Sequence, residues 1–436
     1  MKDSGNRWIG KIPESWDTRR LKYLATLKGR IGWQGLTSEE YQDEGPYLVT
    51  GVDFKDGHID WDSCVHIPFS RWEEAKEIQI ENGDLLITKD GTVGKVAIVD
   101  DQPDKASLNS GVLRIVTNDG YDRRFLYWVL QSEVFWNWFN FKNAGNSTIV
   151  HLYQGDFAEF MYAFPNESEQ HVIAAYLDRK CGQIDDIIAD LQRQIACLES
   201  YKKSLISEAV TKGLNPDVPM KDSGIEWIGQ IPEHWEIKRF KYIFTYITDG
   251  SHFSPETVYE GVPYITAADV QGIGLDYENS KKITRSDYEA LCKTGCKLYK
   301  NDILLVKDGA TTGRMGLVTD DCDCVALSSV AILRTNDHSD HRYYYYMMQS
   351  TNVQEQILAS MAGSAMPRTT LSKIVQYWGI CCPLQEQQAI ATYLDRKCAE
   401  IDTILDDKRR QVENMKNHRK SVIYEYVTGK KRVKEV

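Results

Sequence analysis

Residues 1–23 read MKDSGNRWIGKIPESWDTRRLKY, and residues 220–242 read MKDSGIEWIGQIPEHWEIKRFKY, so 15 of 23 positions are identical. Two more pairs of blocks follow in the same order: DLLITKDGTVGKVAIVDD at 84–101 with DILLVKDGATTGRMGLVTDD at 302–321, and YLDRKC at 176–181 with YLDRKC at 393–398. Blocks that recur in one order identify a tandem duplication. The chain of 436 residues therefore holds two copies of one architecture.

The copies differ most between the shared blocks. Residues 28–80, which begin GRIGWQGLTSEEYQDEGPYLVTGVDF, have little in common with residues 248–299, which begin TDGSHFSPETVYEGVPYITAADV. A repeated frame with unlike inserts indicates that each copy recognises something different.

Each copy combines a mixed segment with a helical one. Residues 1–164 and 220–382 are rich in aromatics and glycine and contain short apolar runs typical of β-strands, which predicts two α+β domains. Residues 165–219 and 383–436 are predicted as a central helix with its linker and a C-terminal helix. Gly213 and Gly429 stand where helix stop signals belong.

The helical segments carry a heptad seam, with steps of four and three. Its apolar residues are Ile184, Ile188, Leu191, Ile195, Leu198 and Leu205 in the first segment and Ile401, Leu405, Val412, Met415 and Val422 in the second. Lys202, Lys408 and Arg419 occupy further seam positions. A strict seam needs a helical partner, so we expect the two helices to pair as an antiparallel coiled coil that spaces the two domains.

Composition sets limits on the class of protein. No apolar run approaches the roughly 18 residues of a membrane helix, and residues 1–10 lack the apolar core of a signal peptide, which predicts a cytoplasmic protein. The ten cysteines are expected to be reduced thiols, because they are too sparse for a disulfide scaffold and no secretion signal is present. The spacing of Cys292 with Cys296 and of Cys322 with Cys324 does not suit a zinc site. The formal charge of −11 is unusual for a protein that binds DNA alone.

The duplicated domains resemble those of the specificity subunits of type I restriction-modification enzymes. The resemblance is also carried by PLQEQQAIATYLDRK at 383–397, PNESEQHVIAAYLDRK at 165–180 and ITDGSH at 247–252. It implies two target-recognition domains, each reading one half of a split, asymmetric site in double-stranded DNA, and a chain without catalytic activity. The implied partners are two methyltransferase (modification) subunits, which the two helical regions and their seam residues are expected to bind, and two restriction subunits. S-adenosylmethionine, ATP and Mg²⁺ are expected in those subunits, and this chain needs no cofactor or metal.

The first copy departs from the pattern, because KGRIGWQG at 28–35 replaces the DGSH-like start. The two half-sites are therefore expected to differ. The acidity of the chain then indicates that the partner subunits complete the grip on DNA.

Candidate DNA contacts lie in loops. KDGTVGK at 89–95 and KDGATTGR at 307–314 pair small residues, which let backbone N–H groups approach a phosphate, with basic side chains. The insert starts and the later polar clusters supply the remaining candidates. The full set is Arg30, Trp33, Gln34, Lys89, Thr92, Lys95, Asn146 and Ser147 in the first copy, and Asp249, Ser251, His252, Lys307, Thr311, Arg314, Ser364 and Arg368 in the second.

Other interpretations remain open for these motifs. The glycine-rich loops equally suit hairpin turns, and the polar clusters suit turns. Aromatic runs at 135–139 and 343–346 are more typical of a core than of base stacking. A two-domain adaptor that binds proteins through the same coiled-coil spacer is the alternative function. No motif of a nuclease or an adenine methyltransferase stands out.

Overall fold

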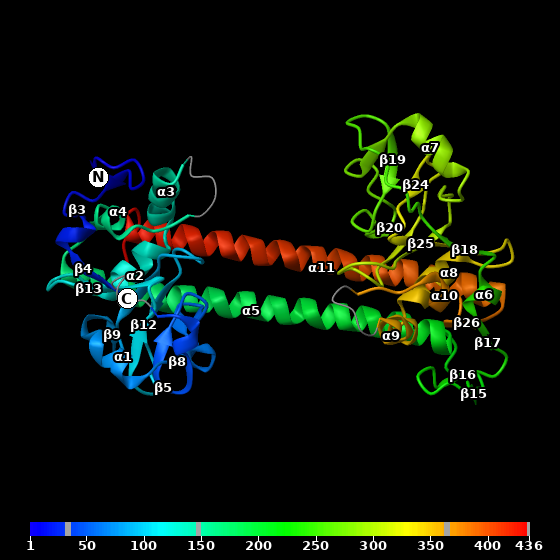
Figure 1. Cartoon of the computed structure of the whole chain (residues 1–436), viewed down its shortest axis with the longest axis horizontal. Helices are drawn as coiled ribbons and strands as arrows, with labels where there is room; N and C mark the ends of the chain where they lie inside the picture. Colours follow the sequence, from blue (N-terminus) through cyan, green and yellow to red (C-terminus); the bar gives the residue numbers. More distant parts are fainter. Residues whose placement is uncertain (31–35, 145–149, 362–366, 434–436) are drawn as a thin grey trace. The chain divides into compact units, whose positions relative to one another are not determined.

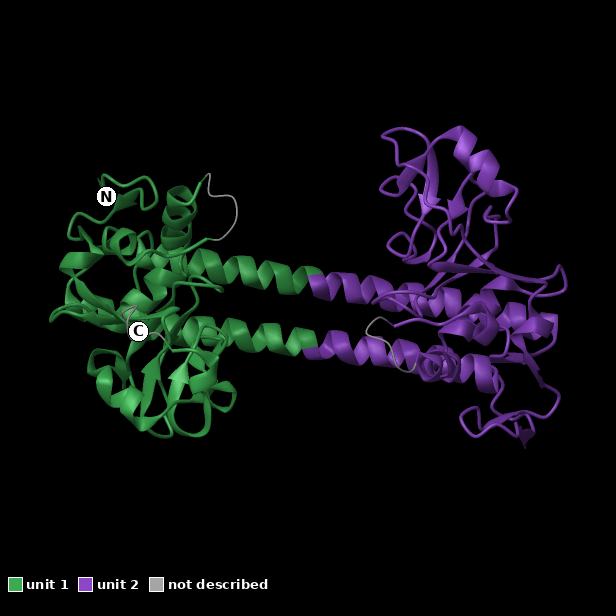
Figure 2. Ribbon diagram, in the orientation of Figure 1, with its two compact units in different colours: residues 1–192, 410–436 green, residues 193–409 purple. Residues whose placement is uncertain are grey.

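The computed structural model describes residues 1–30, 36–144, 150–361 and 367–433. The chain forms two compact units (Figure 2): unit 1 comprises Met1–Gln192 with Arg410–Val436, and unit 2 comprises Arg193–Arg409. Each unit thus contains one globular part and a portion of both long helices. Strand β14 ends at Phe164 and helix α5 begins at Glu167.

Figure 1 shows the two long helices, α5 (Glu167–Lys212) and α11 (Leu384–Val427), of 46 and 44 residues. At 1.5 Å per residue each is about 65–70 Å long. Just after them, Gly213 and Gly429 have φ of 77° and 68°. This left-handed conformation commonly ends a helix and costs glycine nothing. The predicted stop signals therefore lie where the helices end.

Within each unit the two helices run antiparallel. In unit 1, the hydroxyls of Tyr176 and Tyr426 lie 3.2 Å apart, and Arg419 contacts Asp185. In unit 2 the same opposite order links Gln194 with Lys408 and Lys202 with Asp402. A residue later in α5 always meets one earlier in α11. The predicted antiparallel coiled coil is confirmed.

The seam residues are withdrawn from solvent. Buried are Ile184, Leu191, Ile401, Leu405, Val412 and Val422, and half-buried are Ile188, Ile195, Leu198, Leu205 and Met415. The polar residues of the seam have partners on the opposite helix: Lys202 with Asp402, Lys408 with Gln194, and Arg419 with Asp185. A charged side chain is tolerated in such a seam because its head group finds a partner across it.

The globular part of unit 1 is built around a four-stranded sheet of order β11-β10-β13-β4 and a second of order β8-β5-β12-β9. Its strands are β1 Lys2–Asp3, β2 Lys11–Ile12, β3 Asp17–Arg20, β4 Ala25–Gly29, β5 Gln42–Val49, β6 Phe54–Lys55, β7 His58–Ile59, β8 Val65–His66, β9 Gln79–Ile80, β10 Leu85–Thr88, β11 Val96–Ile98, β12 Ala106–Leu108, β13 Val112–Thr117 and β14 Met161–Phe164. Its helices, besides α5 and α11, are α1 Phe69–Glu74, α2 Arg123–Gln131, α3 Glu133–Lys142 and α4 Gln154–Ala158.

Unit 2 repeats the central sheet as β18-β25-β22-β23, extended by β20, beside a three-stranded sheet of order β21-β19-β24. Its strands are β15 Met220–Asp222, β16 Gln230–Pro232, β17 Glu236–Arg239, β18 Tyr246–Asp249, β19 Val262–Ile265, β20 Gly272–Ile273, β21 Lys281–Ile283, β22 Ile303–Val306, β23 Met315–Leu317, β24 Val325–Ala326, β25 Val330–Arg334 and β26 Trp378–Cys381. Its helices are α6 Phe240–Ile243, α7 Arg285–Cys292, α8 His341–Gln349, α9 Thr351–Ser360 and α10 Leu371–Ile374. The predicted α+β class is confirmed in both units.

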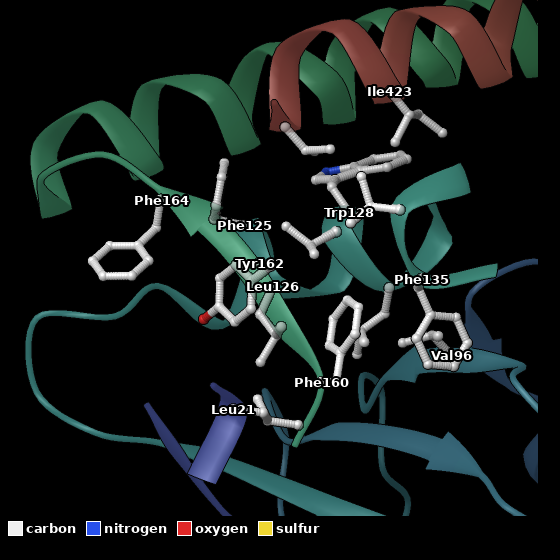
Figure 3. Close-up of a cluster of buried hydrophobic side chains, with 14 of the residues drawn as sticks. Leu21, Val96, Phe125, Leu126, Trp128, Phe135, Phe160, Tyr162, Phe164 and Ile423 are labelled. Carbon is white, nitrogen blue, oxygen red and sulfur yellow. The ribbon is translucent and has the colours of Figure 1, made fainter. Parts of the chain in front are cut away.

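An aromatic core joins the sheet of unit 1 to the long helices (Figure 3). Phe125, Phe135 and Phe160 are fully buried, and Ile423 of α11 lies in the same cluster. In unit 2, the four tyrosines at 343–346 are all buried in the corresponding helix α8. The four tyrosines and Phe135, Trp138 and Phe139 are therefore core, as the alternative interpretation held, whereas Trp136 is exposed.

The YLDRKC motif ties each globular part to a long helix. Asp178 accepts a hydrogen bond from Trp128 Nε1 at 3.0 Å and pairs with Arg124 at 2.7 Å. In unit 2, Asp395 accepts from Tyr346 Oη at 2.8 Å and pairs with Arg342 at 2.8 Å. The two aspartates occupy the same place in the repeated motif, so its recurrence has a structural cause.

A buried glutamine near the start of each long helix performs a second anchoring role. Gln170 accepts from the backbone N–H of Asp122 and donates to the carbonyl of Pro165. Gln387 likewise accepts from Asp340 N–H and donates to Cys382. Both glutamines are at least 96% buried, with 1% and 4% of their surface exposed. Their hydrogen bonds satisfy polar groups that burial would otherwise leave unpaired.

Candidate nucleic-acid interface

Three segments predicted separately meet at one end of the central sheet in unit 2. After β22, the backbone of Lys307 accepts from Thr369 N–H, and Gly309 N–H donates to Pro367. Asp308 pairs with Arg368, Nε to Oδ1 at 2.8 Å. The start of the second insert joins them through Asp249.

Lys307 lies inside this assembly rather than on its surface. Only 2% of the residue is exposed, and its Nζ lies 3.4 Å from Asp249 Oδ2 and 2.9 Å from Asp308 Oδ2. A lysine that is buried between two carboxylates is neutralised by them. The prediction that Lys307 contacts DNA is corrected: it joins the insert start to the glycine-rich loop.

In the DGSH sequence at 249–252, some side chains are buried and hold the loop in place, whereas one is exposed to solvent. Ser251 is buried and its hydroxyl donates to the carbonyl of Phe253 at 2.7 Å, while Asp249 holds Lys307. Gly250 leaves no room for a side chain, because a Cβ there would lie 2.1 Å from the carbonyl oxygen of Ala326. His252, by contrast, has 70% of its side chain exposed.

The surface of this loop cluster is basic. Arg314 is exposed, Thr311 is half-buried, and 61% of the Arg368 side chain is accessible although Asp308 fixes its orientation. The Thr312 hydroxyl closes the glycine-rich loop by donating to Gly309 at 2.7 Å. His252, Arg314 and Arg368 are therefore the described candidates that unit 2 offers to a ligand.

Unit 1 builds the equivalent end from different side chains. The backbone N–H of Leu152 donates to Lys89, as Thr369 does to Lys307. Lys89 is half-buried, whereas Lys95 is exposed and its Nζ donates to the carbonyl of Phe54 at 3.3 Å. The exposed Thr92 donates through its hydroxyl to Gly51 at 2.9 Å.

Arg30 overturns a prediction in this unit. It is 5% exposed, and it donates from Nε to the carbonyl of Leu108 at 2.8 Å and from a terminal nitrogen to Ser107 Oγ at 3.1 Å. Burial lowers the pKa of its guanidinium. The guanidinium of Arg30 therefore faces the interior of the unit, against Leu108 and Ser107, and is not presented to DNA.

Sequence reasoning missed His151. Its Nδ1 lies 2.5 Å from Asp90 Oδ1, so it occupies in unit 1 the place that Arg368 occupies beside Asp308 in unit 2. The sequence marks only the two aspartates, which both follow a lysine and precede a glycine, and it gives no sign that His151 pairs with Asp90. One frame thus carries a histidine in one copy and an arginine in the other.

A cavity of about 520 Å³ lies beside the glycine-rich loop of unit 1. It is lined in part by Lys55, Lys95 and Trp136. Gly94 has φ of 83°, and a Cβ there would lie 2.5 Å from the Trp136 ring. The glycine is therefore required by close packing on α3 as well as by the turn.

Comparison with known proteins identifies this arrangement. A family model described as the type I restriction modification DNA specificity domain matches twice, over residues 13–196 and 232–414. The chain belongs to this family. It is a specificity subunit with two recognition domains, and specificity subunits are the non-catalytic DNA-recognition components of type I restriction-modification systems.

Two relatives from one organism match it over nearly their whole length. A Methanocaldococcus jannaschii chain assigned as the specificity subunit of the type I restriction enzyme MjaX is 25% identical over 98% of this chain and 96% of its own. The type I restriction enzyme MjaVIII specificity subunit of the same organism is 24% identical over 98% and 95%. A solved chain from work on complex assembly and conformational transition of the type I R-M system has a TM-score of 0.71, at 15% identity, over 96% of this chain and 98% of that one. This last likeness concerns the fold alone.

Five predicted contacts of the specificity subunit, namely Trp33, Gln34, Asn146, Ser147 and Ser364, lie outside the described residues. Over the part of the chain that is described, no helix is long and apolar enough to cross a membrane. All ten cysteines are free thiols. Within the same described ranges, no group of three or more His, Cys, Asp or Glu side chains is placed to hold a metal ion.

Proposed function

We propose that this specificity subunit recognises a split, asymmetric site in double-stranded DNA, with one half read by each unit. The observation that carries the proposal is the shared loop frame with unlike side chains: Asp90 with His151 in unit 1, and Asp308 with Arg368 in unit 2. A frame of this kind positions a domain on the phosphate backbone in the same way twice, while different side chains read different bases.

The contacts are assigned by accessibility. Lys95, Arg314 and Arg368 supply cations for phosphate or guanine edges, and His252 supplies a ring nitrogen for a base edge. Thr92, Thr311 and Lys89 lie in the same loops as further contacts. Asp249, Ser251, Lys307 and Arg30 shape the loops from behind.

The assembled enzyme consists, in this proposal, of one specificity subunit with two modification and two restriction subunits. The modification subunits use S-adenosylmethionine to methylate an adenine in each half-site, and the restriction subunits use ATP and Mg²⁺. The paired helices α5 and α11 serve as the scaffold between the recognition domains. Because the chain carries a charge of −11, the partner subunits are expected to contribute much of the electrostatic attraction to DNA.

The test is to express the full chain with the modification subunit of its system and to sequence the methylated bases in the host DNA. We expect one motif with two unlike halves separated by a fixed number of unspecified bases. Replacing residues 248–299 by the corresponding insert of another specificity subunit should change one half and leave the other half and the spacing intact. A continuous motif, or a change in both halves, would contradict the proposal, and protein binding without DNA methylation would favour the adaptor.

A further inference from the structure

A four-residue turn recurs inside the two inserts, although the inserts share little sequence. Residues 50–53, TGVD, follow β5 in unit 1, and residues 266–269, TAAD, follow β19 in unit 2. In both turns the backbone N–H of the aspartate donates to the carbonyl of the threonine that begins the turn, at 3.3 Å in unit 1 and 3.1 Å in unit 2. We name these segments the TxxD turns. The repeated frame of the chain therefore continues into the inserts.

The carboxylate of the aspartate closes each TxxD turn. Asp53 Oδ2 accepts hydrogen bonds from the backbone N–H of Thr50 at 2.7 Å and from its hydroxyl at 2.9 Å. Asp269 Oδ2 accepts the same two bonds from Thr266, at 2.7 Å and 2.8 Å. The two aspartates are only 1% and 8% exposed. Buried carboxylates with their hydrogen bonds made hold the turns from within and are not offered to a ligand.

In unit 1 the TxxD turn packs against the glycine-rich loop. The hydroxyl of Thr92 donates to the carbonyl of Gly51 at 2.9 Å, and a Cβ on Gly51 would lie 3.1 Å from that hydroxyl oxygen. Lys95 Nζ donates to the carbonyl of Phe54, the residue directly after the turn, at 3.3 Å. The turn therefore lies beside two of the candidate DNA contacts of its unit.

In unit 2 one short segment connects the TxxD turn to the other loops of the candidate interface. The backbone N–H of Leu327 donates to the carbonyl of Ile265, the residue directly before the turn, at 2.8 Å. Leu327 also forms a β-bridge with Ser251 of the DGSH sequence. The carbonyl of Ser329 accepts from the backbone N–H of Lys307, at the start of the glycine-rich loop, at 2.8 Å. The turn of unit 2 thus lies in the same loop cluster as the candidate DNA contacts.

The exposed residue of the TxxD turn differs between the units. Val52 is 72% exposed, and Ala268 at the equivalent position is exposed as well. Glycine and small polar residues dominate such turns because they favour the turn itself, whereas an exposed β-branched apolar side chain gains nothing there from folding. Single exposed apolar residues are common on protein surfaces, but Val52 stands on a turn that is fixed beside the glycine-rich loop. Its position favours a contact between its side chain and DNA.

We propose that the TxxD turns contact base edges in the major groove, and that Val52 packs against the C5-methyl group of a thymine in the half-site read by unit 1. The inference rests on the proposed function, which supplies the DNA. A valine side chain has no hydrogen-bonding atom, and the thymine methyl is the apolar group that base edges present in the major groove. Ala268, which lacks the terminal methyl groups of valine, makes a smaller apolar contact at the equivalent base pair of the other half-site. The TxxD frame thus places different side chains at one position of the two half-sites.

The experiment uses the full chain assembled with the modification subunit of its system, and duplexes that carry its methylated motif. Each thymine of the motif, on either strand, is replaced in turn by uracil, which removes only the C5-methyl group. For wild type we expect one thymine, in the half-site that exchange of residues 248–299 leaves unchanged, whose replacement weakens binding about fourfold, the effect of one buried methyl group. Val52→Ala should bind the thymine and uracil duplexes equally at that position. Ala268→Val should alter the base preference at one position of the other half-site, as measured by sequencing of methylated bases.

Val116→Ala is the matched control, because it makes the same chemical change at another exposed valine of unit 1. Val116 is 40% exposed and pairs with Thr26 near the end of the central sheet that lies away from the glycine-rich loop. This variant should keep the affinity of wild type and its full response to uracil. Thermal unfolding should show that all three variants are folded, as expected for substitutions of exposed residues.

Failure of this inference and failure of the proposed function give different results. If wild type produces no split motif, the proposed function fails. If wild type recognises a split motif but no uracil replacement weakens its binding, or if Val52→Ala keeps the full response to uracil, the thymine contact is wrong while the proposed function stands. An Ala268→Val variant with an unchanged motif would overturn the role of the second TxxD turn.

Discussion

Arg419 Nε lies 2.9 Å from Asp185 Oδ1, which joins α11 to α5 within unit 1. Lys202 and Asp402 make the corresponding pair within unit 2, at 2.6 Å. Asp402 follows Asp185, and Arg419 follows Lys202, by the same 217 residues that separate the two YLDRKC motifs. Two ion pairs at equivalent positions of the repeat thus join α5 to α11, one in each unit, and they favour this register of the helices.

Charge reversal across one of these pairs tests this register. Lys202→Asp or Asp402→Lys places like charges together and should lower the free energy of unfolding by about 0.5–1 kcal/mol, a modest value because both side chains are partly exposed. The double exchange should recover most of the loss. Urea unfolding of the four proteins gives the coupling energy, and a purely additive double variant would show that the pair does not stabilise the helices.

Asp395 should matter more than its exposure suggests. It binds both Arg342 and the Tyr346 hydroxyl, and burial together with this carboxylate raises the pKa of Tyr346. Asp395→Asn should destabilise unit 2 by about 1–3 kcal/mol and speed hydrogen exchange in α8. Asp406→Asn is the control on the same helix, since 76% of that side chain is exposed. Equal stabilities for the two variants would refute the anchoring role.

Asp323 gives unit 2 a defined acid sensitivity. Hydrogen bonds from Arg285 and Tyr288 lower its pKa to about 2, from an ordinary value near 4. A depressed pKa contributes stability that is present above the unfolded value and is lost as pH falls from about 4 towards 2. Melting temperatures measured from pH 5 to pH 2 should therefore converge for wild type and Asp323→Asn. A constant difference across this range would argue against the assignment.

Substitutions of the buried Arg30 and the exposed Arg314 should affect stability and DNA binding differently. Arg30→Met leaves Leu108 O and Ser107 without a buried donor and should cost about 1–3 kcal/mol of stability. Arg314→Met should change stability by less than about 0.5 kcal/mol, yet weaken DNA binding by the assembled complex and reduce its salt slope by about 1. Unfolding and DNA titrations on both variants test these expectations. A stable Arg30→Met variant that binds DNA weakly, with a destabilised Arg314→Met variant that binds DNA normally, would contradict them.

The sequence allowed the helices to be predicted because their signal is local. The seams from Ile184 to Leu205 and from Ile401 to Val422 follow a heptad step, and their polar members Lys202 and Arg419 needed only a partner on the opposite helix. The fold class and the duplication were equally accessible, since short apolar runs are local patterns and the shared blocks can be recognised by comparing the sequence with itself.

The candidate site was harder because its contacts are distant in the chain. Arg30 is buried against Leu108, 78 positions away, and Lys307 against Asp249. Composition marks such residues as basic loop residues, and only the folded sheet shows that they point inward. His151 was missed for the same reason, since its partner Asp90 lies 61 positions earlier.

Unit 1 is closed by residues 410–436, which are synthesised after the whole of unit 2. Unit 2 is a single stretch, residues 193–409, so every residue of its core is synthesised before residue 410. Until then the core of unit 1 lacks Val422, Ile423 and Val427, which belong to the end of α11. The usual order, in which an N-terminal domain completes its core first, is therefore reversed, because unit 1 needs residues that are synthesised after the whole of unit 2.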